Sequence, residues 1–310
     1  MNSTFMISVI AAGIVAGTPL LYACLGEILS EKSGIMNLGV EGMMLVGAVV
    51  GFLVSIHTEN KWMGFMAGCS AGAILAFFHG ILTVKLKANQ VASGVALTIF
   101  GTGLSAYLGK SYIGVLPSVS FKGISIPFLN GIPVIGKIFF KNDALVYLSF
   151  ILVFVIWFVL YKTKAGLIVR TVGENPSAAD AAGINIFLVR YICVILGGML
   201  SGAAGAYISL AYSPSWSENM TAGRGWIAVA LVIFAMWNPI RGMMGAYIFG
   251  IINSLGLHLQ AFGFAVPVYI LQMLPYILTF AVLIFTTRET RTRRSAMPQA
   301  LGIPYSREER

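Results

Sequence analysis

The chain has 310 residues, of which 58% are hydrophobic and only 10% are charged, and its mean hydropathy is +0.87. This composition excludes an ordinary soluble domain and is typical of a polytopic membrane protein. The formal net charge is +9. Its basic residues gather in alternate loops, which indicates membrane topology and not nucleic-acid binding.

The apolar pattern predicts an all-α fold with about nine transmembrane helices, and a count from eight to ten fits it. The runs lie at residues 4–29, 37–56, 63–84, 91–109, 145–161, 187–211, 224–237, 240–257 and 267–287. Two of them, 145–161 and 224–237, are short for a hydrocarbon core of ~30 Å. We therefore expect these two to be tilted, broken or longer than the pattern suggests. No linker divides the chain, so we expect one transmembrane domain over 1–287 and a basic tail over 288–310.

The distribution of lysine and arginine predicts which loops face the cytoplasm. Most of the 20 basic residues fall on the side that holds loop 162–187 and the C-terminal tail, which the positive-inside rule places in the cytoplasm. Nine spans then leave the N-terminus outside. Loop 110–144 falls on the external side and contains prolines, glycines and apolar residues. We expect it to form an external cap or a re-entrant hairpin and not a disordered loop.

Loop 162–187 interrupts the hydrophobic pattern with a short predicted helix. Asn175 is a good N-cap, and Pro176 suits the first helical position because its missing N–H is not needed there. Gly183 is placed to end the helix in the left-handed conformation. Residues 176–182 then form two turns, roughly 10 Å long. Their exposed face is mostly Ala and Ser, which suits docking into the groove of another protein and not chemistry.

Polar residues also enter the predicted membrane region near the second span. Asn37 and Glu41 belong to the sequence NLGVEG, and glycines beside a carboxylate suggest an unwound or kinked helix start along a water-filled path. We expect both residues to support the substrate path. The alternative is structural: Asn37 would cap the helix, and Glu41 would favour its positive end.

A second polar entry, Asn89 and Gln90, precedes the fourth span and is a further candidate for the substrate path. Aromatic residues such as Phe100, Trp226 and Tyr269 could stack on a neutral polar ring. The alternative is that the polar side chains make hydrogen bonds between helices.

Catalysis and metal binding have little support in the sequence. No HExxH motif, nucleophile triad spacing or carboxylate pair within one span is present. The three cysteines lie singly in apolar segments and are expected to be small core residues. The run 131–137 imitates a phosphate-binding GxxxxGK loop, but Ile138 stands where Ser or Thr is required. If transport uses ATP, a partner must therefore bind it, and this chain is not expected to be an enzyme.

Taken together, several stretches identify a resemblance to a known family. They are GEILSEKSGIMNLGVEGMM (26–44), KANQVASGVAL (87–97), GLIVRTVGENPSAADAAGI (166–184), GRGWIAVALVIFAMWNP (223–239), LPYILT (274–279) and ALGIPYSREE (300–309). The chain resembles permease subunits of bacterial ABC importers for nucleosides and simple sugars, in the branch that includes ribose-type permeases.

The resemblance implies a set of partners and a location. These are a cytoplasmic ATPase subunit that binds ATP and Mg²⁺, a second permease subunit, and an extracytoplasmic substrate-binding lipoprotein, all at the inner (plasma) membrane. The second permease is expected to be a different chain, although a homodimer is the alternative. Stretch 166–184 resembles the family's coupling helix, which implies ATPase-coupling roles for Glu174, Asn175, Pro176, Ala179 and Gly183.

The resulting hypothesis is a permease that forms the translocation path for a nucleoside or a related simple sugar. The alternative within transport is a pentose or other simple-sugar ABC permease. From a different class, the alternative is a secondary transporter that runs on an ion gradient without an ATPase.

Overall fold

The computed structural model describes residues 3–124, 134–261 and 297–306, with the isolated positions 273, 277, 280 and 284. Within these residues the regular secondary structure is helical, which confirms the predicted all-α fold. The elements are α1 (Ser3–Lys32), α2 (Val40–Thr58), α3 (Lys61–Gly80), α4 (Gln90–Gly109), α5 (Ile135–Phe139), α6 (Ala144–Lys162), α7 (Lys164–Glu174), α8 (Pro176–Ala181), α9 (Ile186–Tyr207), α10 (Arg224–Phe234) and α11 (Pro239–Ala261).

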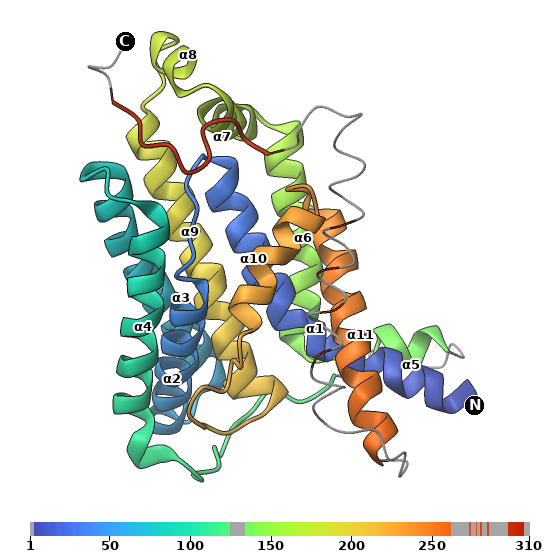
Figure 1. Cartoon of the computed structure of the whole chain (residues 1–310). Coiled ribbons are helices and arrows are strands. Elements are labelled where there is room, and N and C mark those ends of the chain that lie inside the picture. Colours follow the sequence, from blue (N-terminus) through green and yellow to red (C-terminus); the bar gives the residue numbers. More distant parts are fainter. Residues whose placement is uncertain are drawn as a thin grey trace.

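In the described part of the chain, 7 helices are long and apolar enough to cross a membrane. They are Phe5–Lys32, Val40–Thr58, Lys61–Lys85, Gln90–Tyr112, Ala144–Lys162, Ile186–Tyr212 and Pro239–Gln260. Each corresponds to a predicted span, with ends shifted by a few residues. The predicted span 267–287 lies outside the described residues, apart from the four isolated positions. Helices α7 and α8 lie at the opposite end of the bundle from the N-terminus (Figure 1), as the predicted topology requires.

The predicted span 224–237 is not a continuous transmembrane helix. Helix α10 has only 11 residues, about 16 Å at 1.5 Å per residue, which is too short for a hydrocarbon core of ~30 Å. The preceding residues, 213–223, contain no helix. The crossing therefore has a non-helical part and a helical part, which is one of the outcomes that its short apolar run allowed.

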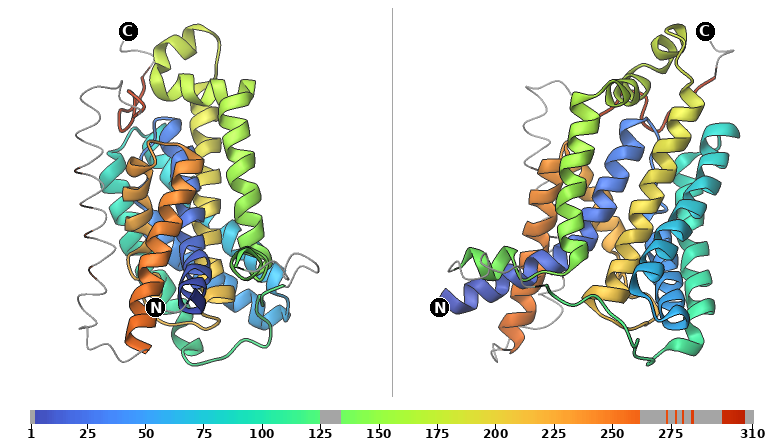
Figure 2. Two further views of the ribbon diagram at one scale, coloured as in Figure 1. Left: turned by 90° about the vertical axis from the view of Figure 1, so that its right-hand side faces the viewer. Right: turned by 180° about the vertical axis from the view of Figure 1, so that it is seen from behind.

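Helix α9 lies at the centre of the bundle and packs against α1, α2 and α3 (Figure 2). Glycines make this close packing possible. A Cβ atom at Gly202 would come within 2.3 Å of the Gly68 carbonyl oxygen, and one at Gly198 within 2.6 Å of the Gly72 carbonyl oxygen. The glycines spaced four residues apart therefore mark faces where helix backbones touch, as small residues do in membrane bundles.

The described parts of loop 110–144 form hydrogen bonds with the bundle and with each other. The Phe121 amide donates to the Leu210 carbonyl at 3.0 Å, and the Ile124 amide donates to Asn142 at 2.9 Å. Residues 125–133 lie outside the described residues, and with them part of the GxxxxGK imitation; its lysine falls within α5. Of the predicted tail, 288–296 and 307–310 also lie outside them.

Candidate functional site

Two short helices, α7 and α8, meet at Asn175 at the end of the bundle opposite the N-terminus (Figure 1); we call this pair the elbow. Thr163 caps α7, because its Oγ1 accepts a hydrogen bond from the Gly166 amide at 3.2 Å. Helix α7 was not predicted, although its residues follow an amphipathic pattern that differs from the uniformly apolar spans on either side. The elbow therefore holds two helices where one was predicted.

The predicted short helix is present as α8, and its ends have the expected chemistry. The Asn175 Oδ1 accepts a hydrogen bond from the Ala178 amide at 3.0 Å, and Pro176 occupies the first helical position. Gly183 has φ +79°, and the amides of Gly183 and Ile184 donate to carbonyls in the last turns of α8 at 2.9 and 3.1 Å. These two bonds form a Schellman motif, which fixes the helix end in a defined geometry.

One face of α8 is exposed, and the other packs against the rest of the protein. Its exposed positions carry small side chains: Ser177, Ala178, Ala181 and Ala182. Ala179 points the other way and is fully buried, in one apolar cluster with Val172, Ile186 and Tyr305. Ala179 would therefore support α8 from within the protein and not contact a partner, whereas Glu174, Asn175 and Gly183 are exposed.

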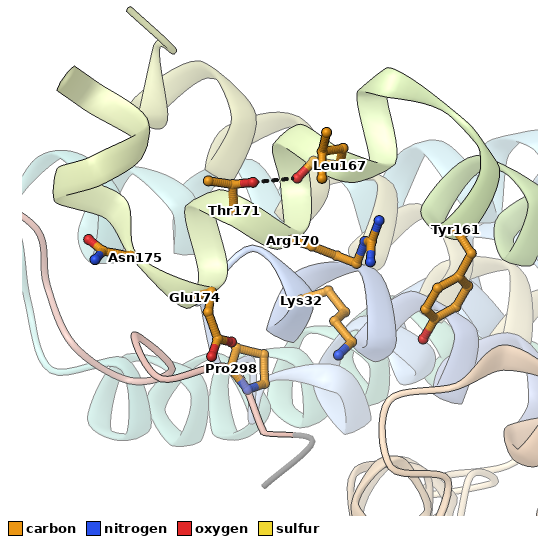
Figure 3. A pocket seen from close by; sticks show the side chains of 8 residues that line it. All are labelled: Lys32, Tyr161, Leu167, Arg170, Thr171, Glu174, Asn175 and Pro298. Carbon is orange, nitrogen blue, oxygen red and sulfur yellow. Dashed lines mark hydrogen bonds between the residues drawn. The ribbon is translucent and has the colours of Figure 1, made fainter. Parts of the chain in front are cut away.

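A pocket of about 460 Å³ lies between the elbow and the ends of α1 and α6. Figure 3 shows the eight residues that line it, among them Lys32, Arg170 and Glu174. The Arg170 guanidinium lies 5.4 Å from the Tyr161 ring centroid, and the Lys32 ammonium lies 5.9 Å from the Trp237 ring centroid. These cation–π contacts hold the charged groups at the aromatic ends of the spans.

Residues 33–39 connect α1 to α2 inside the bundle, and we call them segment 33–39. A Cβ atom at Gly94 would lie within 2.9 Å of Leu38, and one at Gly101 within 2.6 Å of Gly42. Gly101 lies 11 positions after the first residue of α4, about 16 Å along that helix. The start of α2 therefore lies beside the middle of α4 and not beside its first residue. The chain therefore runs alongside the first turns of α4 here without forming a helix.

Side chains from neighbouring helices satisfy the backbone of segment 33–39. The Glu27 carboxylate accepts the Asn37 amide at 2.8 Å, and the Gln90 Oε1 accepts the Met36 amide at 2.7 Å. The His79 Nε2 lies 3.1 Å from the Met36 carbonyl oxygen. Non-helical backbone is tolerated at membrane depth only where such partners exist. Side chains of α1, α3 and α4 thus stabilise the non-helical backbone of this segment.

The predicted substrate-path residues near this segment have structural contacts. Asn37 is fully buried, and its Oδ1 accepts the Gly39 amide at 3.0 Å. Gly39 is the N-cap of α2, so the alternative in which Asn37 caps that helix is wrong. Asn89 caps α4 through a bond from the Ala92 amide at 3.0 Å. Gln90 is 3% exposed.

Glu41 caps a helix, but the helix is α10 and not its own. Its carboxylate accepts hydrogen bonds from the Thr221 hydroxyl at 2.6 Å, the Gly223 amide at 2.9 Å and the Gly225 amide at 2.6 Å. Gly223 is the N-cap of α10, where a carboxylate satisfies unpaired amides and favours the positive end of the helix dipole. Glu41 also lies in the first turn of its own helix α2, where the structural alternative placed it, and its cap on α10 is an additional interaction that the sequence did not predict.

Residues 213–223, which we call segment 213–223, lie against α2 from its C-terminal end inward. Trp216 packs against Phe52, whereas Thr221 contacts Glu41. Phe52 and Glu41 are 11 residues apart on α2, about 16 Å along its axis. The chain therefore follows more than half the length of α2 before α10 begins. Segments 33–39 and 213–223 enter from opposite ends of the bundle, and both lead to Glu41.

Segments 33–39 and 213–223 thus meet at a junction beside Glu41. Next to this junction, the first turn of α10 exposes side chains at the surface of the protein. Trp226 is 40% exposed, and Arg224 is half-buried. The Arg224 Nη1 donates to the carbonyl oxygens of Met220 and Thr221, each at 3.1 Å. Phe100 of α4 is 55% exposed. Of the three aromatic residues that the sequence suggested, Tyr269 lies outside the described residues.

Several buried polar residues were not recognised from the sequence. Glu31 lies in the last turn of α1, where its carboxylate accepts the Trp237 Nε1–H. His79 is 0% exposed and contacts the Ser93 hydroxyl at 3.0 Å. Their partners are far away in sequence, so no local spacing signal could have revealed them.

Comparison with known proteins assigns the chain to a family. Residues 4–287 match the family described as "Branched-chain amino acid transport system / permease component". The chain is 42% identical to TsgC13 of Haloferax volcanii, provisionally named a glucose ABC transporter permease protein, over 98% of this chain and 99% of the relative. It is 34% identical to the nucleoside ABC transporter permease protein NupC of Lactococcus lactis, over 98% and 99% of the two chains.

A third relative is the guanosine ABC transporter permease protein NupQ of Bacillus subtilis, 35% identical over 96% of each chain. No solved structure matches the chain. The chain belongs to this permease family. The predictions of an ABC transporter permease and of a multi-pass plasma-membrane protein are thereby confirmed.

Proposed function

We propose that this chain lines the path of an ABC importer for nucleosides or simple sugars, and that a separate cytoplasmic ATPase drives it by docking on α8. The observation that carries the proposal is α8 itself. This short helix has a cap at each end and an exposed face of Ser177, Ala178, Ala181 and Ala182. It lies on the side predicted to be cytoplasmic. Small side chains leave room for the groove of a partner, and the two caps resist fraying when α8 is pushed.

Substrate is proposed to pass along the surface beside Glu41, where the two non-helical segments meet. Transporters commonly place their substrate sites at discontinuous helices near the membrane midplane. Trp226 and Arg224 are the side chains best placed to stack on a ring and to donate hydrogen bonds. Asn37, Glu41, Asn89 and Gln90 then act as supports of the path, because their polar groups already bind the backbone.

The remaining parts of the transporter are proposed to be separate chains. ATP and Mg²⁺ bind to the ATPase subunit, an extracytoplasmic lipoprotein delivers the substrate, and a second, different permease completes the path. This division is the one that the family resemblance implies.

The relatives divide between nucleosides and glucose, so the substrate class needs a direct test. Cells with and without the chain would be assayed for uptake of labelled guanosine, uridine, ribose and glucose. We expect chain-dependent uptake of the nucleosides. Chain-dependent uptake of glucose or ribose alone would favour the sugar permease, a second candidate that the 42% identity to TsgC13 supports. Chain-dependent uptake of none of the four compounds would contradict both.

A further inference from the structure

The described part of the C-terminal tail, residues 297–306, is built into the fold; we call it the tail segment. Ala300 is 6% and Tyr305 is 7% exposed. The Tyr305 ring packs in one cluster with Val172 of α7, Ala179 of α8 and Ile186 of α9. The tail segment passes beside α7 (Figure 1), and its Tyr305 side chain is part of the buried cluster beneath the elbow.

The tail segment is hydrogen-bonded to both helices of the elbow. The Tyr305 hydroxyl donates to the Asp180 Oδ2 of α8 at 2.9 Å. The Ala300 amide donates to the Gly173 carbonyl in the last turn of α7 at 3.0 Å. Carbonyls in the last turn of a helix have no partner within the helix. The tail segment therefore supplies a donor where α7 needs one and fixes the carboxylate of α8.

The other side of the tail segment contacts the start of segment 33–39. The Gly302 amide donates to the Gly34 carbonyl at 3.3 Å. Arg190 of α9, which is 2% exposed, donates from Nε to the Ser33 carbonyl at 3.2 Å and from Nη1 to the Ile303 carbonyl at 3.5 Å. A cation at the C-terminal end of α1 also favours the negative end of its helix dipole.

We infer that the tail segment is the positioning element through which movement of α8 reaches segment 33–39 and the junction at Glu41. This inference rests on the proposed function, because it takes α8 as the point where the ATPase pushes. Helix α8 packs on α7 and α9 and on the tail segment. The tail segment in turn contacts segment 33–39, whose Asn37 amide is held by Glu27. Displacement of Tyr305 is thus transmitted through Gly302 to Gly34.

The test compares transport with ATP hydrolysis in the purified complex reconstituted into liposomes. Tyr305→Ala removes the ring and the hydroxyl, and Tyr305→Phe removes the hydroxyl alone while keeping the packing. Ile303→Ala is the matched control, because its side chain is 57% exposed on the same segment. For each variant, co-purified ATPase, ATP hydrolysis and substrate uptake are measured.

We expect Tyr305→Ala to retain the ATPase and its hydrolysis while uptake per ATP falls by about tenfold, within the range seen for coupling residues. Tyr305→Phe should show a smaller loss, and Ile303→Ala none. Unchanged uptake per ATP in Tyr305→Ala would overturn the inference. Loss of the ATPase from both Tyr305 variants would also overturn it, because the tail segment would then be part of the surface that docks the ATPase and not a positioning element. If the wild type itself recovers no ATPase, the proposed function fails, and the inference fails with it.

Discussion

Glu41 is the residue on which the non-helical stretch before α10 depends. It sits near the start of α2, and its carboxylate accepts three hydrogen bonds from residues of segment 213–223 and α10. Without this carboxylate, the amides of Gly223 and Gly225 at the start of α10 would lose their acceptor. A carboxylate that is costly in lipid is stabilised here by the donors it satisfies.

Replacement of Glu41 by Ala is therefore expected to destabilise the protein and abolish transport. Each buried donor left unsatisfied costs about 1–3 kcal/mol. Glu41→Gln should be milder, because its amide oxygen still accepts a hydrogen bond. Thermal unfolding in detergent would rank the variants, with exposed Glu218→Ala as the control. Equal stability of Glu41→Ala and the wild type would refute this role.

Trp226 is the residue through which the proposed substrate path can be tested. If its exposed ring stacks on the substrate, Trp226→Ala should raise the KM for uptake by about 5-fold or more, since stacking on a base contributes about 1–3 kcal/mol. Trp62→Ala serves as the control, because Trp62 is 48% exposed near the external end of α3. A KM that does not change in Trp226→Ala would exclude Trp226 from the path.

At the scale of elements, glycine contacts set the packing of α2, α3 and α9. Gly202→Ala would place a methyl group 2.3 Å from the Gly68 carbonyl oxygen, and such overpacking typically costs about 1–3 kcal/mol. Gly103→Ala is the matched control, because nothing lies within 4 Å of its added Cβ. We expect a lower unfolding temperature for Gly202→Ala only, measured in the same detergent. Equal shifts in both variants would mean that helix contact is not the reason.

Elements with local chemistry were predictable from the sequence, whereas those that depend on distant partners were not. Asn175, Pro176 and Gly183 define α8 within nine residues, so the helix and both of its ends could be predicted. The break before α10 gave only an ambiguous short run, because its cap, Glu41, comes from 182 positions away in the chain. The burial of Tyr305 likewise depends on a contact between the tail segment and α8 that no periodicity encodes.

At the scale of the whole molecule, the account requires α8 to face the cytoplasm and loop 110–144 to face outside. Single cysteines at Ser177 and Ser118, both exposed, would report this in intact cells. The native Cys24, Cys69 and Cys193 are buried and should add little background. A membrane-impermeant maleimide should label Ser118→Cys directly and Ser177→Cys only after the membrane is opened. The reverse pattern would invert the topology.

The central claim is that a separate ATPase acts on this permease through α8, and recovery of that ATPase tests it most directly. The tagged chain would be purified from its native membrane in mild detergent as wild type, Ala178→Arg and Ala178→Ser. Ala178 is suited to this because it is exposed, whereas Ala179 is buried and arginine there would disturb folding. The account predicts an ATPase subunit with the wild type and with Ala178→Ser, and its loss with Ala178→Arg. If none of the three recovers an ATPase, the account is contradicted, and a carrier driven by an ion gradient takes its place.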